Sequence, residues 1–399
     1  MKLSQRVKNL QPSATIALSD KAKKLQGEGV DVVNLTAGEP DFPTPSAIKK
    51  AASQAIADGK VDSYTAAKGI LPLRLAIARK VNALYKADFS ADDVAVTTGA
   101  KFALYLLGQV LLDPGDEVLI PVPFWVSYSE QIKLAGGVPV SVQPSPKTGK
   151  VNPSSLDKLC TPKTRALIIN SPQNPSGLVY SKEELLELGH WAVAHNVTLI
   201  TDDIYHDLVF NDTAFHSVFE FGGEIRDSTI LVSGFSKSYA MTGWRVGFIV
   251  GPQDVIHSVN SLLSQTTSNL TAVSQYAALA AVDLPQNEIE KMRLSYEERL
   301  DHFYPEFAAL PGFSFAFRPQ GAFYFFPNIT EALKILGLSS AKEFAARLLS
   351  EAHVAVVPGE AFGQPGFIRI SYAAAPQELE KGIQRINKFM QSHVQEEKV

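Results

Sequence analysis

Residues 233–247 read SGFSKSYAMTGWRVG, and this stretch decides the fold and the chemistry that we expect. The apolar run from Thr229 to Val232 comes directly before it and predicts a buried strand. Lys237 thus follows a strand end and has small neighbours, so its amine can lose water and approach a planar ligand. Lysines are rarely buried without a partner or a chemical role. Such an amine suits a Schiff base with an aldehyde cofactor; the alternative is a surface lysine in a loop rich in serine and glycine.

Short apolar runs alternate with helical stretches from about residue 94 to residue 250. The predicted strands are residues 94–97, 117–121, 138–142, 165–170, 198–201, 229–233 and 246–250. Several are continuously apolar, as expected for strands that helices cover on both faces. Repeated alternation of strand and helix predicts an α/β fold with a mostly parallel sheet. A ligand of such a sheet binds beyond the carboxyl ends of the strands.

The pattern changes after about residue 290 and predicts a smaller α+β lobe. Its expected helices are residues 291–310, 342–352 and a closing helix from Pro376, and its expected strands are residues 313–317, 323–326, 354–357 and 367–372. We therefore expect an amino-terminal segment (1–45) that packs with the small domain, a large domain (46–290) and a small domain (291–399).

Composition excludes several classes of function. A net charge of −4 argues against nucleic acid or an anionic membrane as the main partner. No apolar stretch approaches the about 20 residues that span a bilayer, and residues 1–10 lack the apolar core of a signal peptide. The single Cys160 fits a reducing compartment, so we expect a cytoplasmic protein. No histidine pair has metal-ligand spacing, and we expect no metal site.

The stretch around Lys237 resembles the lysine signature of the class I/II pyridoxal-phosphate aminotransferases. Gly243, Arg245 and Gly247 follow the lysine at the spacing of that family. The resemblance runs from Thr15 to Arg369 and is closest to the bacterial aspartate aminotransferases of class Ib. It implies the pyridoxal-phosphate-dependent transferase fold type I, an α/β fold with a mostly parallel seven-stranded sheet, helices on both faces and a smaller α+β domain. It also implies pyridoxal 5′-phosphate (PLP) as the cofactor on Lys237.

A phosphate site is expected where residues 97–101, TTGAK, join a strand to a helix. Gly99 lets a phosphate approach the backbone, and the following helix start offers free N–H groups. Arg245 can add two hydrogen bonds. The predicted phosphate ligands are Gly99, Ala100, Lys101 and Arg245, with Ser233 and Ser236 both left open as hydroxyl donors.

Three further stretches each follow a predicted strand. Residues 170–177, NSPQNPSG, form a proline-rich turn or the family's loop, in which Asn174 is implied to bind the phenolic oxygen of the cofactor and the substrate carboxylate. Asp202 either caps a helix or pairs with the pyridine nitrogen, which makes the ring an electron sink. The resemblance implies that Tyr205 donates to the phenolic oxygen. It also implies that Trp125, otherwise a core aromatic, stacks on the ring and contacts substrate.

A dimer is also implied by the resemblance. Tyr64 matches a tyrosine that reaches across a subunit interface to the phosphate of the partner. We therefore expect a homodimer in which each site needs two chains.

Substrate recognition is expected at the small lobe. Arg369 lies on a predicted strand, where it is either an edge-strand surface charge or a bidentate ligand of a carboxylate. The resemblance implies the α-carboxylate, with backbone contact from Gly38. It assigns the second carboxylate to Lys101 and Thr15; otherwise Lys101 only begins a helix.

The expected enzyme is an aspartate aminotransferase that exchanges the amino group between L-aspartate and 2-oxoglutarate by ping-pong kinetics, giving oxaloacetate and L-glutamate. Lys237 is its expected catalytic acid and base. Action on prephenate or aromatic amino acids stays open, as does a PLP-dependent carbon–sulfur lyase on the same fold. A sensor domain of a transcription regulator would carry an amino-terminal helix-turn-helix module, for which motifs beginning at Thr15 leave no room.

Overall fold

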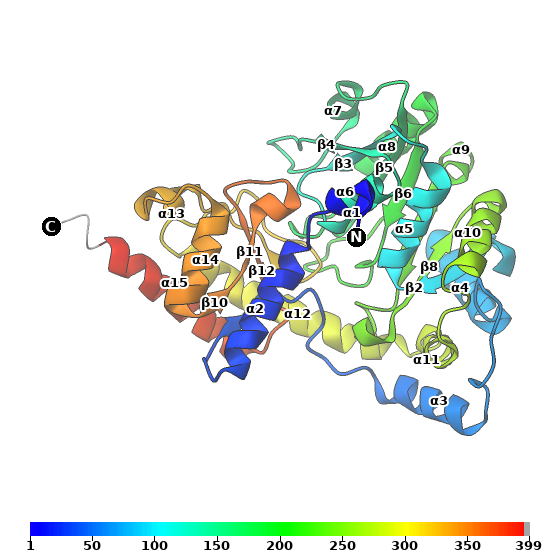
Figure 1. Ribbon diagram of the computed structural model, residues 1–399, viewed down its shortest axis with the longest axis horizontal. Helices are drawn as coiled ribbons and strands as arrows, with labels where there is room; N and C mark the ends of the chain where they lie inside the picture. Colours follow the sequence, from blue (N-terminus) through cyan, green and yellow to red (C-terminus); the bar gives the residue numbers. More distant parts are fainter. Residues whose placement is uncertain (395–399) are drawn as a thin grey trace.

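The computed structural model describes residues 1–394 and has a large and a small lobe (Figure 1). Helix α12 (Gln286–Ala308) runs from the large lobe into the small one. The other helices of the large lobe are α3 (Ser46–Ala57), α4 (Leu71–Tyr85), α5 (Ala100–Leu111), α6 (Ser127–Leu134), α7 (Pro153–Asp157), α8 (Lys182–His195), α9 (Glu224–Asp227), α10 (Gln253–Gln265) and α11 (Ala272–Val282). The remaining helices are α1 (Gln5–Lys8), α2 (Ala14–Gly27), α13 (Thr330–Ile335), α14 (Ala341–Ala352) and α15 (Pro376–Val394).

The large sheet has seven strands in the order β2-β8-β7-β6-β5-β3-β4. They are β2 (Val94–Thr98), β3 (Glu117–Pro121), β4 (Val138–Val142), β5 (Thr164–Asn170), β6 (Thr198–Asp202), β7 (Thr229–Gly234) and β8 (Val246–Val250). Six of them run in the same direction, whereas β8 is antiparallel to both of its neighbours, β2 and β7. The predicted mostly parallel sheet is confirmed, and each predicted strand lies within one residue of the observed bounds.

Helices cover both faces of this sheet, as its apolar strands predicted (Figure 1). Leu199 and Ile200 are consecutive on β6, yet they pack into different cores. Leu199 meets side chains of α8, and Ile200 lies in the core that α5, α6 and α10 share. Side chains alternate along a strand, so this division shows that both faces are buried.

The small lobe combines distant parts of the chain. Its sheet has the order β11-β12-β9, with β9 (Tyr324–Phe325), β11 (Val357–Pro358) and β12 (Ile368–Ser371) all antiparallel. A separate pair joins β1 (Val33–Asn34) to β10 (Val354–Ala355). The expected strand 354–357 is therefore divided, because its first half pairs with β1 and its second half with β12.

The expected strand 313–317 is wrong. Its only pairing is an isolated bridge between Ser314 and Asn328. Phe313 lies in the core of the small lobe, whereas Phe317 packs so closely on Gly149 of the large lobe that an added Cβ there would lie 2.7 Å from its ring. Core packing and contact between the lobes thus account for the apolar alternation without a continuous strand.

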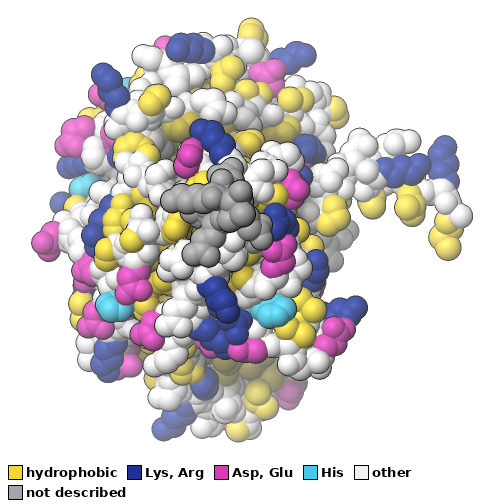
Figure 2. Space-filling model, turned by 90° about the vertical axis from the view of Figure 1, so that its left-hand side faces the viewer, with side chains coloured by type: hydrophobic (Ala, Val, Ile, Leu, Met, Phe, Trp, Pro, Cys, Tyr) yellow, Lys and Arg dark blue, Asp and Glu magenta, His cyan; other side chains and the backbone are white. Residues whose placement is uncertain are grey.

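The boundary expected at residue 291 falls inside α12, which begins at Gln286. The division into 1–45, 46–290 and 291–399 stays a prediction. None of the helices in residues 1–394 is long and apolar enough to cross a membrane. Figure 2 shows the small-lobe side, on which basic and acidic side chains are interspersed.

Candidate active site

A cavity of about 320 Å³ lies between the lobes, beyond the carboxyl ends of the parallel strands. The predicted site residues that line it are Thr15, Gly38, Ala100, Lys101, Trp125, Asn174, Asp202, Tyr205, Ser236, Lys237, Arg245 and Arg369. The cavity therefore unites residues from the beginning, middle and end of the chain.

Lys237 lies in the turn after β7 and lines the cavity. It is partly buried, and its Nζ donates a hydrogen bond to the carbonyl oxygen of Gly38. Burial lowers the pKa of the Lys237 amine to about 8, and the positive charge of Arg369 acts in the same direction. About a tenth of the amine is therefore neutral and nucleophilic at pH 7, far more than for an ordinary lysine.

Asp202 ends β6 and faces the same cavity with 3% of its surface exposed. The Tyr128 hydroxyl donates to its Oδ2 at 2.6 Å, and the backbone N–H of Ile204 donates to its Oδ1 at 3.3 Å. Burial raises the pKa of Asp202 to about 6, although the Tyr128 hydrogen bond opposes the change. A cation placed against this carboxylate would restore its full charge, and a protonated ring nitrogen is such a cation.

An anion cradle lies where β2 passes into α5. Gly99 has a φ of 79°, and a Cβ added there would lie 2.5 Å from Nη2 of Arg245. The Arg245 guanidinium thus covers the start of α5, with its Nη1 donating to the Thr242 carbonyl oxygen at 2.8 Å. A guanidinium beside a helix start offers several N–H groups to a phosphate, and Ser236 adds a hydroxyl at the same cavity.

Three predicted cofactor ligands are not among the residues that line the cavity: Gly99, which directly precedes Ala100 at the start of α5, Ser233 and Tyr64. Ser233 is 2% exposed, and its hydroxyl donates to the carbonyl oxygen of Asp203 at 3.3 Å. The expectation that Ser233 binds phosphate is therefore corrected, because its hydroxyl is buried and bonded to the backbone away from the cavity lining. Tyr64 is 91% exposed in the single chain. Its place in the site of a partner stays a prediction.

Arg369 marks the other end of the cavity. It is 2% exposed, and it donates through Nη1 to Asn174 Oδ1 at 3.1 Å and through Nη2 to the Thr36 carbonyl oxygen at 2.7 Å. Its Nε finds no hydrogen-bond partner among the described residues. An unpaired buried donor is costly, so this end of the cavity is suited to an anionic ligand.

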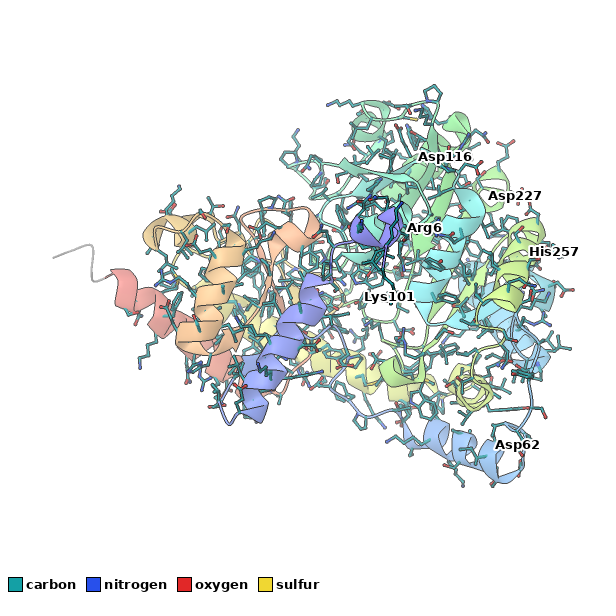
Figure 3. The ribbon with its side chains drawn as sticks, in the orientation of Figure 1. Arg6, Asp62, Lys101, Asp116, Asp227 and His257 are labelled. Atoms are coloured by element: carbon teal, nitrogen blue, oxygen red, sulfur yellow. The ribbon has the colours of Figure 1, made fainter. Side chains whose placement is uncertain are left out.

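Lys101 lies at the amino-terminal end of α5, on the side of the lobe where α1 also lies (Figure 3). Its Nζ is 5.0 Å from the centre of the Trp125 ring. Burial lowers the pKa of Lys101, and nearby Arg245 does so too. Since Thr15 also lines the cavity, this wall could hold a second anionic group.

The sequence did not single out Tyr128, Asn170 and Tyr324, which also line the cavity. Asn170 carried a usable signal, because it ends β5 just as its register partner Asp202 ends β6. Its amide donates to the carbonyl oxygen of Asp202 at 2.8 Å. The hydroxyl oxygens of Tyr324 and Tyr205 are 2.9 Å apart. Tyr324 stands in an aromatic run, residues 323–326, and nothing in that run marks it as a site residue.

No cluster of three or more histidine, cysteine, aspartate or glutamate side chains is arranged to hold a metal within residues 1–394. The donor set of the cavity instead suits an organic group with one phosphate and one basic ring nitrogen. Arg245 and the start of α5 at Gly99 suit the phosphate, Asp202 suits the ring nitrogen, and Lys237 lines the same cavity as Asp202 and Arg245. These residues therefore fit PLP.

An α/β fold that brings a lysine, an aspartate and an arginine together between two lobes defines the class of fold type I transferases. The family model for aminotransferase class I and II matches residues 30–386, and the chain belongs to this family. An aspartate aminotransferase of Geobacillus stearothermophilus is 46% identical over 98% of this chain and 100% of its own length.

Two further relatives agree with this family. The chain is similar to a probable aspartate/prephenate aminotransferase of Aquifex aeolicus, 42% identical over 98% of both chains. Among solved structures, it resembles the aspartate aminotransferase of Thermus thermophilus with maleate, with a TM-score of 0.91 and 40% identity over 97% of this chain and 99% of that one.

Proposed function

We propose that this chain is a PLP-dependent aspartate aminotransferase that exchanges the amino group between L-aspartate and 2-oxoglutarate, giving oxaloacetate and L-glutamate. The observation that carries the proposal is the placement of Lys237, with its lowered pKa, in one cavity with Asp202 and Arg369. The names of relatives similar over nearly the whole chain support the choice of reaction.

The residues divide the work of holding the cofactor. Lys237 would hold its aldehyde carbon, Asp202 would pair with its ring nitrogen, and Arg245 with the start of α5 would bind its phosphate. Trp125 would cover one face of the ring, and Asn174 and Tyr205 would bind its phenolic oxygen. When bound, PLP supplies an electron sink that makes the proton on the α-carbon of an amino acid acidic.

The chain's own groups then move the proton. When its amine is free, Lys237 would remove the proton from the α-carbon of the substrate as a general base, and the same group would then deliver a proton as a general acid. A pKa of about 8 suits both tasks near neutral pH. Arg369 and Asn174 fix the α-carboxylate, which orients the α-hydrogen toward Lys237.

The second carboxylate of the substrate is assigned to Lys101 and Thr15. Both line the cavity, and the structural relative with maleate holds a dicarboxylate. Prephenate also carries two carboxylates, and the Aquifex relative is named for both substrates. Aspartate is our first choice, and action on prephenate or aromatic amino acids is the alternative.

A panel of half-reactions tests this assignment. Single amino acids are added to the loaded protein, and conversion of the bound cofactor from its aldehyde form to its amine form is followed by absorbance. Aspartate and glutamate should react well and alanine poorly.

The variant Lys101→Gln tests the role of Lys101. Its rate constant kcat/KM for aspartate should fall about tenfold or more, because one hydrogen bond to a charge is lost, while that for alanine should change little. Equal losses for both would contradict the role of Lys101.

Lys237→Ala tests the chemistry itself. The variant should lose the visible band of the covalently held cofactor and all transamination, whereas Lys133→Ala, a change on the exposed face of α6, should keep both. Normal turnover by Lys237→Ala would remove the proposal. Release of ammonia and pyruvate from a sulfur amino acid by the unaltered protein would point to a carbon–sulfur lyase instead.

We also propose a homodimer in which Tyr64 completes the phosphate site of the partner. Tyr64 is 91% exposed, and the hydrophobic side chains of Ile56, Leu71 and Leu75 are each more than half exposed on α3 and α4, the helices that flank Tyr64 in the sequence. Large apolar side chains left exposed in a single chain are consistent with an interface on this part of the molecule. Because the single Cys160 fits a reducing compartment, the proposed location is the cytoplasm.

Mixed dimers test the shared site. Tyr64→Ala and Lys237→Ala should each be impaired as pure proteins. A hybrid of the two variants contains one site with both native residues, because Tyr64 comes from the chain that lacks Lys237. Mixing after mild dissociation should therefore restore activity. No recovery in a mixture shown to contain hybrids would contradict the shared site.

A further inference from the structure

The Asp203–Ile204 peptide group connects buried polar side chains outside the cavity to the carboxylate of Asp202. The N–H of Ile204 donates to Asp202 Oδ1 at 3.3 Å. At the other end of the same peptide unit, the carbonyl oxygen of Asp203 contacts His206 Nδ1 at 2.9 Å and accepts from Ser233 Oγ at 3.3 Å. The backbone N–H of His206 also donates to this oxygen, at 3.1 Å. The peptide therefore connects His206 and Ser233 to the carboxylate of Asp202.

The chemistry of its neighbours fixes the role of His206. A carbonyl oxygen only accepts hydrogen bonds, so Nδ1 must carry a proton. On the opposite side of the ring, Nε2 lies 3.1 Å from Asp207 Oδ2, and the two side chains are only 9% and 14% exposed. This contact is not a well-aligned hydrogen bond, and it becomes an ion pair only when the imidazole carries a second proton. Burial works against a charged imidazole, yet Asp207 raises the pKa of His206 above its usual value.

Other charged and titratable groups surround the same ring. Asp203 turns its carboxylate away from the cavity and accepts hydrogen bonds from the Tyr85 hydroxyl at 2.8 Å and from Thr201 at 2.6 Å. Lys80 of α4 lies nearby and contacts the Tyr239 hydroxyl. Neither His206 nor Ser233 lines the active-site cavity, so neither can touch substrate or cofactor.

We propose that His206, assisted by Ser233, is a positioning residue that orients and polarises the Asp203–Ile204 peptide so that its N–H holds the Asp202 carboxylate against the cofactor ring. This inference rests on the proposed function, since it concerns the partner of the ring nitrogen. Hydrogen bonds at one end of a peptide group strengthen the bond made at its other end. Loss of the Nδ1 donor should therefore weaken the contact of Ile204 with Asp202.

A pair of isosteric variants tests the proposal. His206→Asn places an amide nitrogen at the position of Nδ1 and can keep the bond to the Asp203 oxygen, whereas His206→Gln places its amide at the position of Nε2 and loses that bond. PLP is titrated into each apoprotein by fluorescence. His206→Gln should raise the dissociation constant about threefold to tenfold, the range of one neutral hydrogen bond, and His206→Asn should stay near the unaltered protein.

A second readout follows the visible band of the bound cofactor with pH. If Asp202 pairs less well with the ring nitrogen, less positive charge remains on the ring, and the Lys237 nitrogen keeps its proton to higher pH. The midpoint of the band should thus rise in His206→Gln and not in His206→Asn. A purely structural role would lower the melting temperature without moving this midpoint.

Two further variants keep the test decisive. His216→Gln serves as a matched control, because His216 contacts Glu220 at 2.8 Å outside the cavity. Ser233→Ala removes the other side-chain donor to the Asp203 carbonyl oxygen. It should raise the dissociation constant of PLP and the pH midpoint of the visible band, each by less than His206→Gln does. This variant still tests the proposal if His206→Gln does not fold. Equal values for His206→Gln, His206→Asn and the unaltered protein would overturn the inference while leaving the proposed function intact. Failure of the unaltered protein to bind PLP would instead overturn the proposed function.

Discussion

Arg369 Nη1 donates to Asn174 Oδ1 at 3.1 Å, and this hydrogen bond joins the two lobes across the cavity. Arg369 comes from β12 of the small lobe, and Asn174 follows β5 of the large one. Both groups are buried, and Arg369 Nε still lacks a partner among the described residues. A carboxylate bound here would satisfy that donor and draw both lobes toward one ligand.

Arg369→Lys should therefore lower kcat/KM for aspartate by about two to three orders of magnitude, the cost of breaking a buried charge pair. A lysine keeps the charge but loses the planar fork that matches a carboxylate. Steady-state kinetics measure the loss, and the visible band of the bound cofactor should not change. Arg318→Lys, at the surface pair with Asp301, is the control. Full activity of Arg369→Lys would contradict the assignment.

The pH dependence of cofactor attachment reports on Lys237. Burial lowers its pKa to about 8 from an ordinary 10.5, and only the neutral amine attacks an aldehyde. The rate at which PLP adds to the apoprotein should thus rise with pH and level off above about 8. Glu39 raises the pKa of Lys237, so Glu39→Gln should move the midpoint to lower pH. Stopped-flow absorbance gives both values, and a midpoint near 10.5 would show that the amine is not buried.

Tyr128→Phe should weaken cofactor binding about tenfold or more, because the carboxylate of Asp202 loses a hydrogen bond to a charged group. Tyr128 also lowers the pKa of Asp202. Without the hydroxyl, Asp202 becomes protonated at higher pH, so cofactor affinity should begin to fall at a higher pH as the solution is acidified. Titrations across pH measure this shift. Tyr105→Phe on α5, outside the cavity, should show neither effect.

Gly99→Ala should weaken binding of PLP, because its Cβ, 2.5 Å from Nη2 of Arg245, would displace that guanidinium and because its φ is 79°. Two controls separate these causes. Gly243→Ala has nothing within 4 Å of the new Cβ, and Gly115→Ala combines open space with a φ of 93°. Cofactor titration with melting curves should show weaker binding only in Gly99→Ala. A comparable loss of binding in Gly115→Ala would assign the effect to backbone strain.

The strands of the large sheet could be predicted because each is a short apolar run between helical stretches. The direction of β8 could not, since the run Val246–Val250 looks the same in a parallel or an antiparallel strand. Cavity residues such as Lys237 and Asp202 were found because each follows a strand end, where a parallel sheet collects its functional groups.

The positions of other residues relative to the cavity could be found only from the structure. Ser233 and Ser236 are equally plausible hydroxyl donors in sequence, and only the alternation along β7 and the following turn assigns them to different sides. Tyr128 reaches Asp202 from a helix 74 positions earlier in the chain. Contacts of this kind depend on how layers pack, which no local pattern encodes.

The hydrogen bond from Arg369 to the Thr36 carbonyl oxygen has a consequence for folding during synthesis. The two residues are 333 positions apart in sequence, yet the guanidinium depends on that carbonyl oxygen for its orientation. Since a ribosome releases the chain from its amino terminus, the early segment must wait for almost the entire polypeptide before it can dock. A chain that still lacks Arg369, whether incomplete or truncated, therefore cannot form this carboxylate site. The active site is complete only when synthesis is nearly finished.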